Sequence, residues 1–218
     1  MEIDFPILMD AKGFIERLLP HVVATRNPSW NRKCADWKRR YPQHEGHPFP
    51  KIGPIGHGQF VDALSTVIPE NTLISVGSSG LAVEFFFAGF RNKRGQRTFL
   101  TSGLGAMGYG LPAAIGSCLG NNATPMVLVE SDGSFQLNIQ ELATLKFYGF
   151  PICILIMNNN GYASIRNTQR HHFSGRYLAS GPDSGVQLPS LSSVASTYDL
   201  PYLLIKGCEN LSENLTNA

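Results

Sequence analysis

Short, almost wholly apolar runs alternate with longer mixed segments through most of the chain. The runs at residues 126–130 and 152–157 are apolar at nearly every position, as strands buried on both faces of a parallel sheet require. Predicted strands cover residues 73–76, 98–101, 126–130, 152–157 and 202–205, and predicted helices cover 59–68, 81–87, 109–119, 139–148 and 191–198. This alternation predicts an α/β fold, a doubly wound parallel sheet with helices on both faces.

The first 58 residues follow a different pattern. A short strand is expected at residues 7–9, followed by Asp10 as the cap of a helix over 11–19. Residues 27–58 are rich in Pro, His, Gly and basic residues and show no clean periodicity, so they are predicted to form a linker across a surface. We expect residues 1–26 to be the tail of a preceding domain and 59–218 to be the α/β domain, with both chain ends cut or unusually short.

Composition and charge narrow the class of protein. Hydrophobic residues make up 43% and charged residues 16% of the chain, which is typical of a soluble globular protein. The net charge is +2, and the basic group at residues 91–97 is too short to indicate nucleic-acid binding. There is no signal peptide or membrane-length apolar run, and the four cysteines have neither disulfide nor zinc spacing, which predicts buried thiols in a cytoplasmic protein.

Polar residues follow two of the apolar runs directly. Ser131, Asp132, Gly133 and Ser134 come after the run 126–130, and residues 158–161 come after the run 152–157. Since the carboxyl ends of parallel strands meet at one edge, neighbouring strands would place Asp132 beside Asn159. These side chains and a Gly161 carbonyl would give Mg²⁺ three oxygen ligands, leaving room for two diphosphate oxygens and a water. The Gly133 and Ser134 backbone at a helix start suits a phosphate.

These residues also resemble a known cofactor signature. Asn159 lies in an Asn-Asn pair 27 residues after Asp132, which is similar to the Gly-Asp-Gly-Ser and Asn-Asn motif of thiamine-diphosphate enzymes. Residues 102–112 and 140–145 resemble acetolactate synthases in particular. By this resemblance, residues 1–26 are the tail of the family's central domain, 27–58 a linker and 59–218 the C-terminal domain that binds thiamine diphosphate and Mg²⁺.

The resemblance implies a set of site residues. The aminopyrimidine would face the backbone of Gly105 and Met107, with Ala106 as a further cofactor contact, and Gly77, Ser78 and Ser79 would contact the diphosphate. Further cofactor contacts are implied for Ser131, Asp132, Gly133, Ser134, Asn159, Gly161, Tyr162 and Ala163, with Asp132, Asn159 and Gly161 as metal ligands. The catalytic glutamate of the family lies on a separate pyrimidine-binding domain, so we assign no catalytic residue here and expect the isolated chain to be inactive. Glu84 and Glu141 are predicted to be ordinary helix-face carboxylates.

The family's chemistry would then apply to the intact protein. A homodimer or homotetramer would decarboxylate a 2-keto acid such as pyruvate and transfer the acyl unit to a carbonyl acceptor, as a lyase and transferase. Ser131 and the Ser78-Ser79 pair depart from the family pattern, and Thr168 stands where acetolactate synthases usually have Trp. The smaller Thr168 predicts a bulkier acceptor, such as a keto-sugar, with donors supplied by residues 165–176.

Other interpretations remain open. Met107 could fill the core, as we expect for residues 85–87, and residues 167–186 are predicted to be a surface loop rather than a substrate lid, with His171 and His172 solvated. The chain could be a non-catalytic fragment or degenerate homologue that acts in binding or oligomerisation. A nicotinamide or flavin domain is a further alternative, because residues 103–108 match G-x-G-x-x-G, although no suitable acidic residue follows for the ribose.

Overall fold

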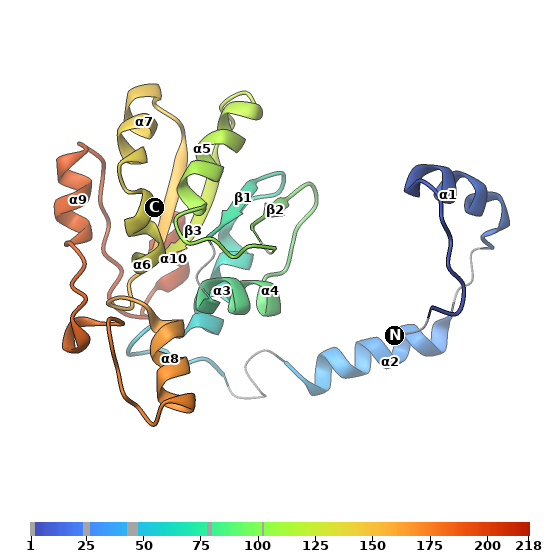
Figure 1. Cartoon of the computed structure of the whole chain (residues 1–218), viewed down its shortest axis with the longest axis horizontal. Coiled ribbons are helices and arrows are strands. Elements are labelled where there is room, and N and C mark those ends of the chain that lie inside the picture. The colour runs from blue at the N-terminus through green and yellow to red at the C-terminus, as the bar shows by residue number, and fades with distance from the viewer. Residues whose placement is uncertain (1–2, 24–26, 43–47, 78–79, 102) are drawn as a thin grey trace. The chain divides into compact units, whose positions relative to one another are not determined.

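The computed structural model describes residues 3–23, 27–42, 48–77, 80–101 and 103–218. They belong to two compact units, Met1–Gly46 and His47–Ala218 (Figure 1). The first unit contains α1 (Ala11–Leu18), the short 3-10 helix η1 (Leu19–His21) and α2 (Pro28–Arg40). The second contains all the strands and carries the candidate site.

The first helix begins where the sequence predicts. The Asp10 side chain accepts hydrogen bonds from the backbone N–H groups of Lys12 and Gly13, at 3.0 and 3.3 Å, and caps α1. The strand predicted at residues 7–9 is wrong, because the backbone there is irregular and Leu8 is fully exposed. No strand is assigned in the described part of this unit to pair with it, so apolar residues alone did not produce one.

Helix α2 contradicts the prediction of an irregular linker over residues 27–58. Asn27 caps the helix by accepting a hydrogen bond from the Trp30 N–H at 3.1 Å, and Pro28 occupies the first turn. The rings of Trp30 and Trp37 pack edge to face with centroids 5.7 Å apart. The Asn-Pro start and the seven-residue spacing of the tryptophans are helix signals that the high polar content concealed.

The second unit is built on four parallel strands in the order β2-β1-β3-β4. The strands are β1 (Leu73–Val76), β2 (Arg97–Phe99), β3 (Met126–Ser131) and β4 (Ile152–Met157). The longer helices are α3 (His57–Val67), α4 (Gly80–Gly89), α5 (Gly110–Gly120), α7 (Glu141–Tyr148) and α8 (Ala163–His172). The shorter ones are α6 (Asp132–Phe135), η2 (Gln136–Asn138), η3 (Pro182–Ser184), α9 (Leu191–Thr197) and α10 (Leu211–Thr216).

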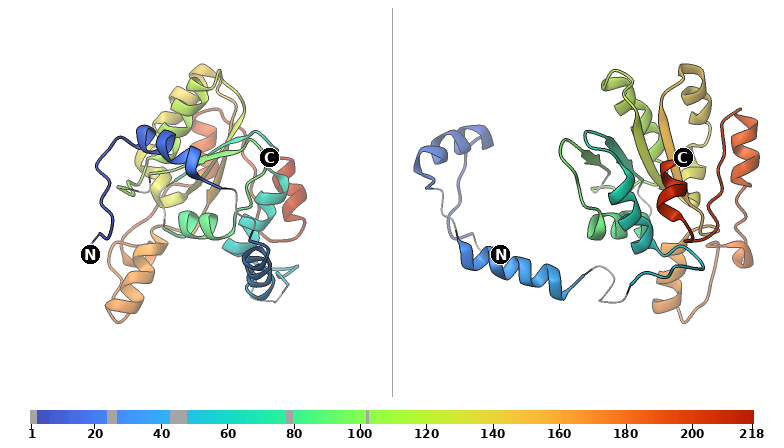
Figure 2. Two further views of the ribbon diagram at one scale, coloured as in Figure 1. Left: turned by 90° about the vertical axis from the view of Figure 1, so that its right-hand side faces the viewer. Right: turned by 180° about the vertical axis from the view of Figure 1, so that it is seen from behind.

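Helices cover both faces of the sheet, as the sequence predicts (Figure 2). On one face Ile74, Val76 and Val129 pack with buried residues of α3, α4 and α10. On the other, Met126 and Leu128 pack with buried residues of α5 and α7. Because successive strand residues point to opposite faces, each run must be apolar throughout. The doubly wound α/β prediction is confirmed, and β1 and β4 have the predicted bounds.

The strand order places a topological switch point at the carboxyl edge of the sheet. The chain leaves β1 for β2 through α4, on one face, and then returns past β1 to β3 through α5, on the other. The connection after β3 leads to α7, on the same face as α5, so it diverges from the connection after β1 although the two strands are direct neighbours. Ligands of doubly wound sheets bind at such a switch point.

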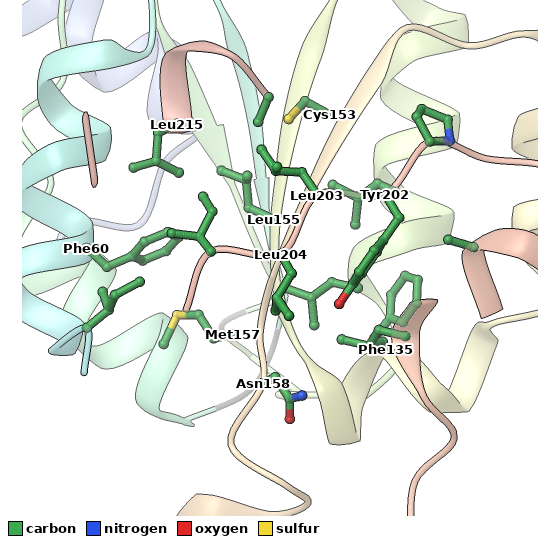
Figure 3. Close-up of a pocket in the computed structure, with 18 of the residues that line it drawn as sticks. Phe60, Phe135, Cys153, Leu155, Met157, Asn158, Tyr202, Leu203, Leu204 and Leu215 are labelled. Carbon is green, nitrogen blue, oxygen red and sulfur yellow. The ribbon is translucent and has the colours of Figure 1, made fainter. Parts of the chain in front are cut away.

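Three further expectations fail. Residues 202–205 form no strand, since no ladder hydrogen bonds join them to β4. Tyr202, Leu203 and Leu204 are about half exposed. They line an apolar cavity of about 660 Å³ beside β4 with Leu155 and Met157 (Figure 3). In residues 85–87 only Phe86 is buried, because one helix face meets the core. Two cysteines, Cys34 and Cys153, are only partly buried.

The central strand should be the least tolerant of truncation. Leu128 is fully buried, whereas Leu119 on α5 is 67% exposed. We expect Leu128→Ala to lower the free energy of unfolding by about 2–5 kcal/mol through lost burial and the cavity left behind. Leu119→Ala, the matched control, should cost less than about 1 kcal/mol. Urea unfolding of both variants measures the difference, and similar losses would contradict the assigned core.

Candidate metal and anion site

The pairing of β3 with β4 brings the two polar motifs together. Ser131 at the end of β3 is in register with Met157 at the end of β4. Asp132 begins α6 immediately after β3, and Asn158 follows β4 directly. The juxtaposition predicted from the sequence therefore occurs, at the carboxyl edge of the sheet next to the switch point.

Asp132 is 5% exposed, and backbone groups fix its carboxylate. Its Oδ1 accepts a hydrogen bond from the N–H of Gly133 at 2.9 Å, and its Oδ2 accepts one from the N–H of Gly161 at 2.9 Å. The second bond ties the loop after β4 to the end of β3. Each oxygen keeps a further lone pair, so the carboxylate can still ligate a cation.

Asn159 provides an acceptor with no partner in the part of the chain that the structure describes. Its side-chain Oδ1 is buried and accepts no hydrogen bond from the described residues. The loop around it turns sharply, because Asn160 and Gly161 both have positive φ, 59° and 119°. Buried acceptors without partners are rare and costly, which points to a missing ligand at this position.

Gly133 and Ser134 complete this part of the site. A Cβ on Gly133 would lie 2.8 Å from the Gly161 carbonyl oxygen and 2.7 Å from the Tyr162 ring, so only glycine allows the two loops to approach. The Ser134 hydroxyl is buried and accepts a hydrogen bond from the Gly108 N–H at 3.0 Å. The segment before α5 is thereby attached to α6.

The remaining predicted cofactor residues lie on adjoining segments. Gly77 is buried directly after β1, and its N–H donates to the Val129 carbonyl at 2.8 Å, whereas Ser78 and Ser79 lie outside the described residues. Gly105 and Ala106 are exposed before α5, and Met107 is 44% exposed rather than core filling. The last predicted residues, Tyr162 and Ala163, stand at the start of α8.

Glu130 is a buried carboxyl that sequence reasoning missed. It is fully buried at the end of β3, and burial raises its pKa to about 7, against the opposing effect of polar groups on Ser131, Ser134 and Gly110. Oε1 accepts a hydrogen bond from the Ser131 N–H at 3.0 Å, whereas Oε2 has no partner among the described residues. A charged residue inside an otherwise apolar strand was the available signal.

Arg166 was also misjudged. The sequence places it among donors for a substrate, but its guanidinium donates to three backbone carbonyls: Asn159 at 2.6 Å, Asn160 at 3.0 Å and Ser180 at 2.6 Å. It therefore joins the Asn159 loop to the segment around Ser180.

The surface loop predicted from residue 167 begins later, because α8 continues to His172, where basic side chains favour a helix C-terminus. His171 and His172 are exposed, as predicted.

The donor set suits a hard cation. The described residues contain no cluster of three or more His, Cys, Asp and Glu side chains, the pattern expected of zinc or iron. One carboxylate, one amide oxygen and a nearby backbone carbonyl leave ligand positions for phosphate oxygens, as Mg²⁺ prefers. The partnerless Asn159 oxygen is the observation that fits such an ion.

Comparison with known proteins identifies the class to which this fold and site belong. Residues 75–218 match the family model described as thiamine pyrophosphate enzyme, C-terminal TPP binding domain, and the chain belongs to this family. A solved Rhodococcus jostii RHA1 thiamine diphosphate-dependent 4-hydroxybenzoylformate decarboxylase superposes with a TM-score of 0.63 over 78% of this chain and 32% of its own, at 19% identity. That likeness supports the fold.

The curated relatives are acetolactate synthase large subunits, so the chain is acetolactate-synthase-like within this family. It is 28% identical to that of Pyropia yezoensis over 87% of this chain and 31% of the relative. It is 30% identical to isozyme 1 of Escherichia coli K12 over 75% of this chain and 28% of the relative. The chain thus spans about a third of these relatives' length. No helix among the described residues has the length and apolar character to cross a membrane.

Arg166 should stabilise the loop that carries the candidate ligands. Arg166→Met keeps the aliphatic stem but removes three donors, which should lower the free energy of unfolding by about 2–4 kcal/mol. Arg170→Met, an exposed change on the same helix, is the matched control and should cost less than about 0.5 kcal/mol. Thermal unfolding of both variants checks this, and equal melting temperatures would disprove the stabilising role of Arg166.

Proposed function

We propose that this chain binds thiamine diphosphate through Mg²⁺ and serves as the cofactor-binding domain of an acetolactate-synthase-like enzyme. In the intact protein, the enzyme decarboxylates a 2-keto acid, pyruvate being the simplest, and transfers the acyl unit to a carbonyl acceptor. Membership of the thiamine pyrophosphate enzyme family supports the cofactor. The relatives named as acetolactate synthase large subunits support the reaction class.

The buried, partnerless oxygen of Asn159 carries this proposal. It belongs to the loop that the Gly161 N–H bonds to Asp132 at 2.9 Å. A cation coordinated by Asp132, Asn159 and the Gly161 carbonyl would satisfy the orphaned acceptor and offset the repulsion between the Asp132 carboxylate and a diphosphate. The metal would therefore be required for the anion to bind.

The diphosphate would lie in the crevice between the connections after β1 and β3. Gly133 and Ser134 at the start of α6, with Gly77 across the crevice, offer backbone close to that position. Ser131, Tyr162 and Ala163 border the same edge, and Ser78 and Ser79 are proposed from the sequence alone. The exposed residues Gly105, Ala106 and Met107 are proposed to receive the aminopyrimidine.

Bound thiamine diphosphate would supply the carbon centre that accepts the acyl unit of the 2-keto acid. The residues of this chain would hold the metal and diphosphate, fix the orientation of the ring system through Met107, and exclude water at the buried end of the crevice. We propose that the proton-relay glutamate comes from a pyrimidine-binding domain, within a homodimer or homotetramer. Glu84 is exposed on α4, and Glu141 accepts a hydrogen bond from Thr144 at 3.0 Å on α7, in agreement with ordinary helix-face roles.

The acceptor is proposed to be bulkier than pyruvate. Thr168 is exposed on α8, two residues after Arg166. It stands at the position where acetolactate synthases usually carry Trp. Since Arg166 donates to backbone carbonyls, the exposed donors left nearby are Arg170, His171 and His172. A small side chain with cationic groups beside it suits a polar acceptor such as a keto-sugar.

Removing a proposed metal ligand should weaken cofactor binding without unfolding the domain. We expect calorimetric titration to detect thiamine diphosphate binding only when Mg²⁺ is present. Asp132→Ala and Asn159→Ala should each weaken it by at least about tenfold, or about 1.4 kcal/mol. Asp183→Asn and Asn167→Ala, exposed changes outside the crevice, are the matched controls and should bind like the wild type.

Other results would support other functions. Tight NAD binding would favour a nicotinamide domain built on residues 103–108. Binding that does not depend on Mg²⁺ would refute the metal assignment. Cofactor binding without turnover, even when a pyrimidine-binding domain is supplied, would favour a non-catalytic module.

A larger side chain at position 168 should narrow the range of acceptors that the assembled enzyme uses. Thr168→Trp adds an aromatic wall, and we expect the kcat/KM for a keto-sugar acceptor to fall at least about tenfold while that for pyruvate falls less. Thr168→Ser is the conservative control. Product analysis with mixed acceptors measures the partition, and an enzyme that makes acetolactate efficiently and ignores keto-sugars would disprove the acceptor proposal.

A further inference from the structure

The carboxyl of Glu130 lies where three segments of the proposed cofactor cleft meet. The strand that carries it pairs with β1, and Gly77 directly after β1 donates its N–H to the Val129 carbonyl at 2.8 Å. Gly110 begins α5 and also borders the carboxyl. Figure 1 shows the ends of β1 and β3 and the start of α5 in the same region. The side chain thus lies at the carboxyl edge of the sheet, at the switch point next to Gly77 and Gly110.

Two glycines leave the space that this carboxyl fills. A Cβ on Gly77 would stand 1.9–2.0 Å from both oxygens and the carboxyl carbon of Glu130, and those are its three nearest atoms. A Cβ on Gly110 would stand 2.3 Å from Oε2 of the same group. Because Glu130 is fully buried, its carboxyl has no exposed position to which it could move. Backbone and carboxyl therefore fit each other at both contacts.

Hydrogen bonds connect the carboxyl to the metal and anion segment. Oε1 accepts from the Ser131 N–H at 3.0 Å, next to Asp132. The Ser134 hydroxyl, which also interacts with Glu130, accepts from the Gly108 N–H at 3.0 Å in the segment before α5. The Asn138 side chain donates to the Gly108 carbonyl at 2.8 Å. Glu130 therefore lies beside a hydrogen-bond network that joins the start of α6 to the segment before α5.

We propose that Glu130 is a positioning residue for the cofactor site: its buried carboxyl sets the separation between Gly77, the start of α5 and the Ser131–Ser134 backbone, and so the shape of the cleft that receives the diphosphate. This inference rests on the proposed function for the identity of the ligand. The fit between Glu130 and Gly77 is independent of any ligand and is tested first.

A double-mutant cycle on the chain without cofactor tests that fit. Gly77→Ala should lower the melting temperature by about 5 °C, because the added methyl overlaps the carboxyl. In the Glu130→Ala variant, Gly77→Ala should lower the melting temperature by less than about 2 °C, since the overlapping carboxyl atoms are gone. Gly56→Ala, at a glycine with φ of −74° and nothing within 4 Å of the added Cβ, is the matched control. Additive effects in the cycle would overturn the inference.

Cofactor titration tests the positioning role itself. Glu130→Gln has the same shape and retains an acceptor for the Ser131 N–H, so it should bind thiamine diphosphate with Mg²⁺ within about threefold of the wild type. Glu130→Ala should bind at least about tenfold more weakly at a temperature where circular dichroism shows it folded. The circular dichroism check separates weaker binding by a folded variant from a loss of folding.

The outcomes separate this inference from the proposed function. If the wild type binds the cofactor and Glu130→Ala binds equally well, the positioning role is wrong while the proposed function stands. If Glu130→Gln binds as poorly as Glu130→Ala, the role assigned to the side chain's shape is wrong. If the wild type fails to bind even with Mg²⁺, the proposed function is overturned together with the cofactor role of Glu130, whatever the unfolding cycle shows.

Discussion

The parallel register of β3 and β4 is the constraint on which the candidate site depends. With Ser131 opposite Met157, the first residues beyond each strand fall at one level of the sheet edge. A shift of one residue would exchange the faces to which the side chains of β4 point and move Asn159 away from Asp132. The same apolar runs that build both cores therefore also set the positions of the polar groups, without any direct bond between the Asp132 and Asn159 side chains.

Support for the site comes largely from groups outside the polar motifs. Arg166 joins the Asn159 loop to the segment at Ser180, and Glu130 fills the space that Gly77 and Gly110 leave. Both side chains are long and polar, and both are committed to neighbouring backbone rather than to solvent. Backbone held in this way keeps a binding site close to its working geometry before a ligand arrives, which lowers the entropy lost on binding.

The sequence predicted best the features that a short window contains. Strands β1 and β4 were predicted with their observed bounds, and the position of each polar motif directly after its strand predicted that the two loops meet when β3 and β4 pair. Helix α2 was missed because polar residues outnumber its tryptophans, and the strand at 202–205 was predicted from apolar residues although a strand also needs a partner. Glu130 stood out locally as a charged residue in an apolar run, but the space for its carboxyl is left by glycines 53 and 20 positions away in the sequence, which no local pattern revealed.

The partnerless oxygen of Asn159 has a consequence for the stability of the domain. An acceptor buried without a partner costs about 1–3 kcal/mol in the folded state, and that cost is absent when the chain unfolds into water. A cation that satisfies the oxygen removes this penalty and also favours the folded state by mass action. Part of the stability of the folded domain would then come from its bound metal and cofactor. Its lifetime in the cell would therefore depend on the local supply of both.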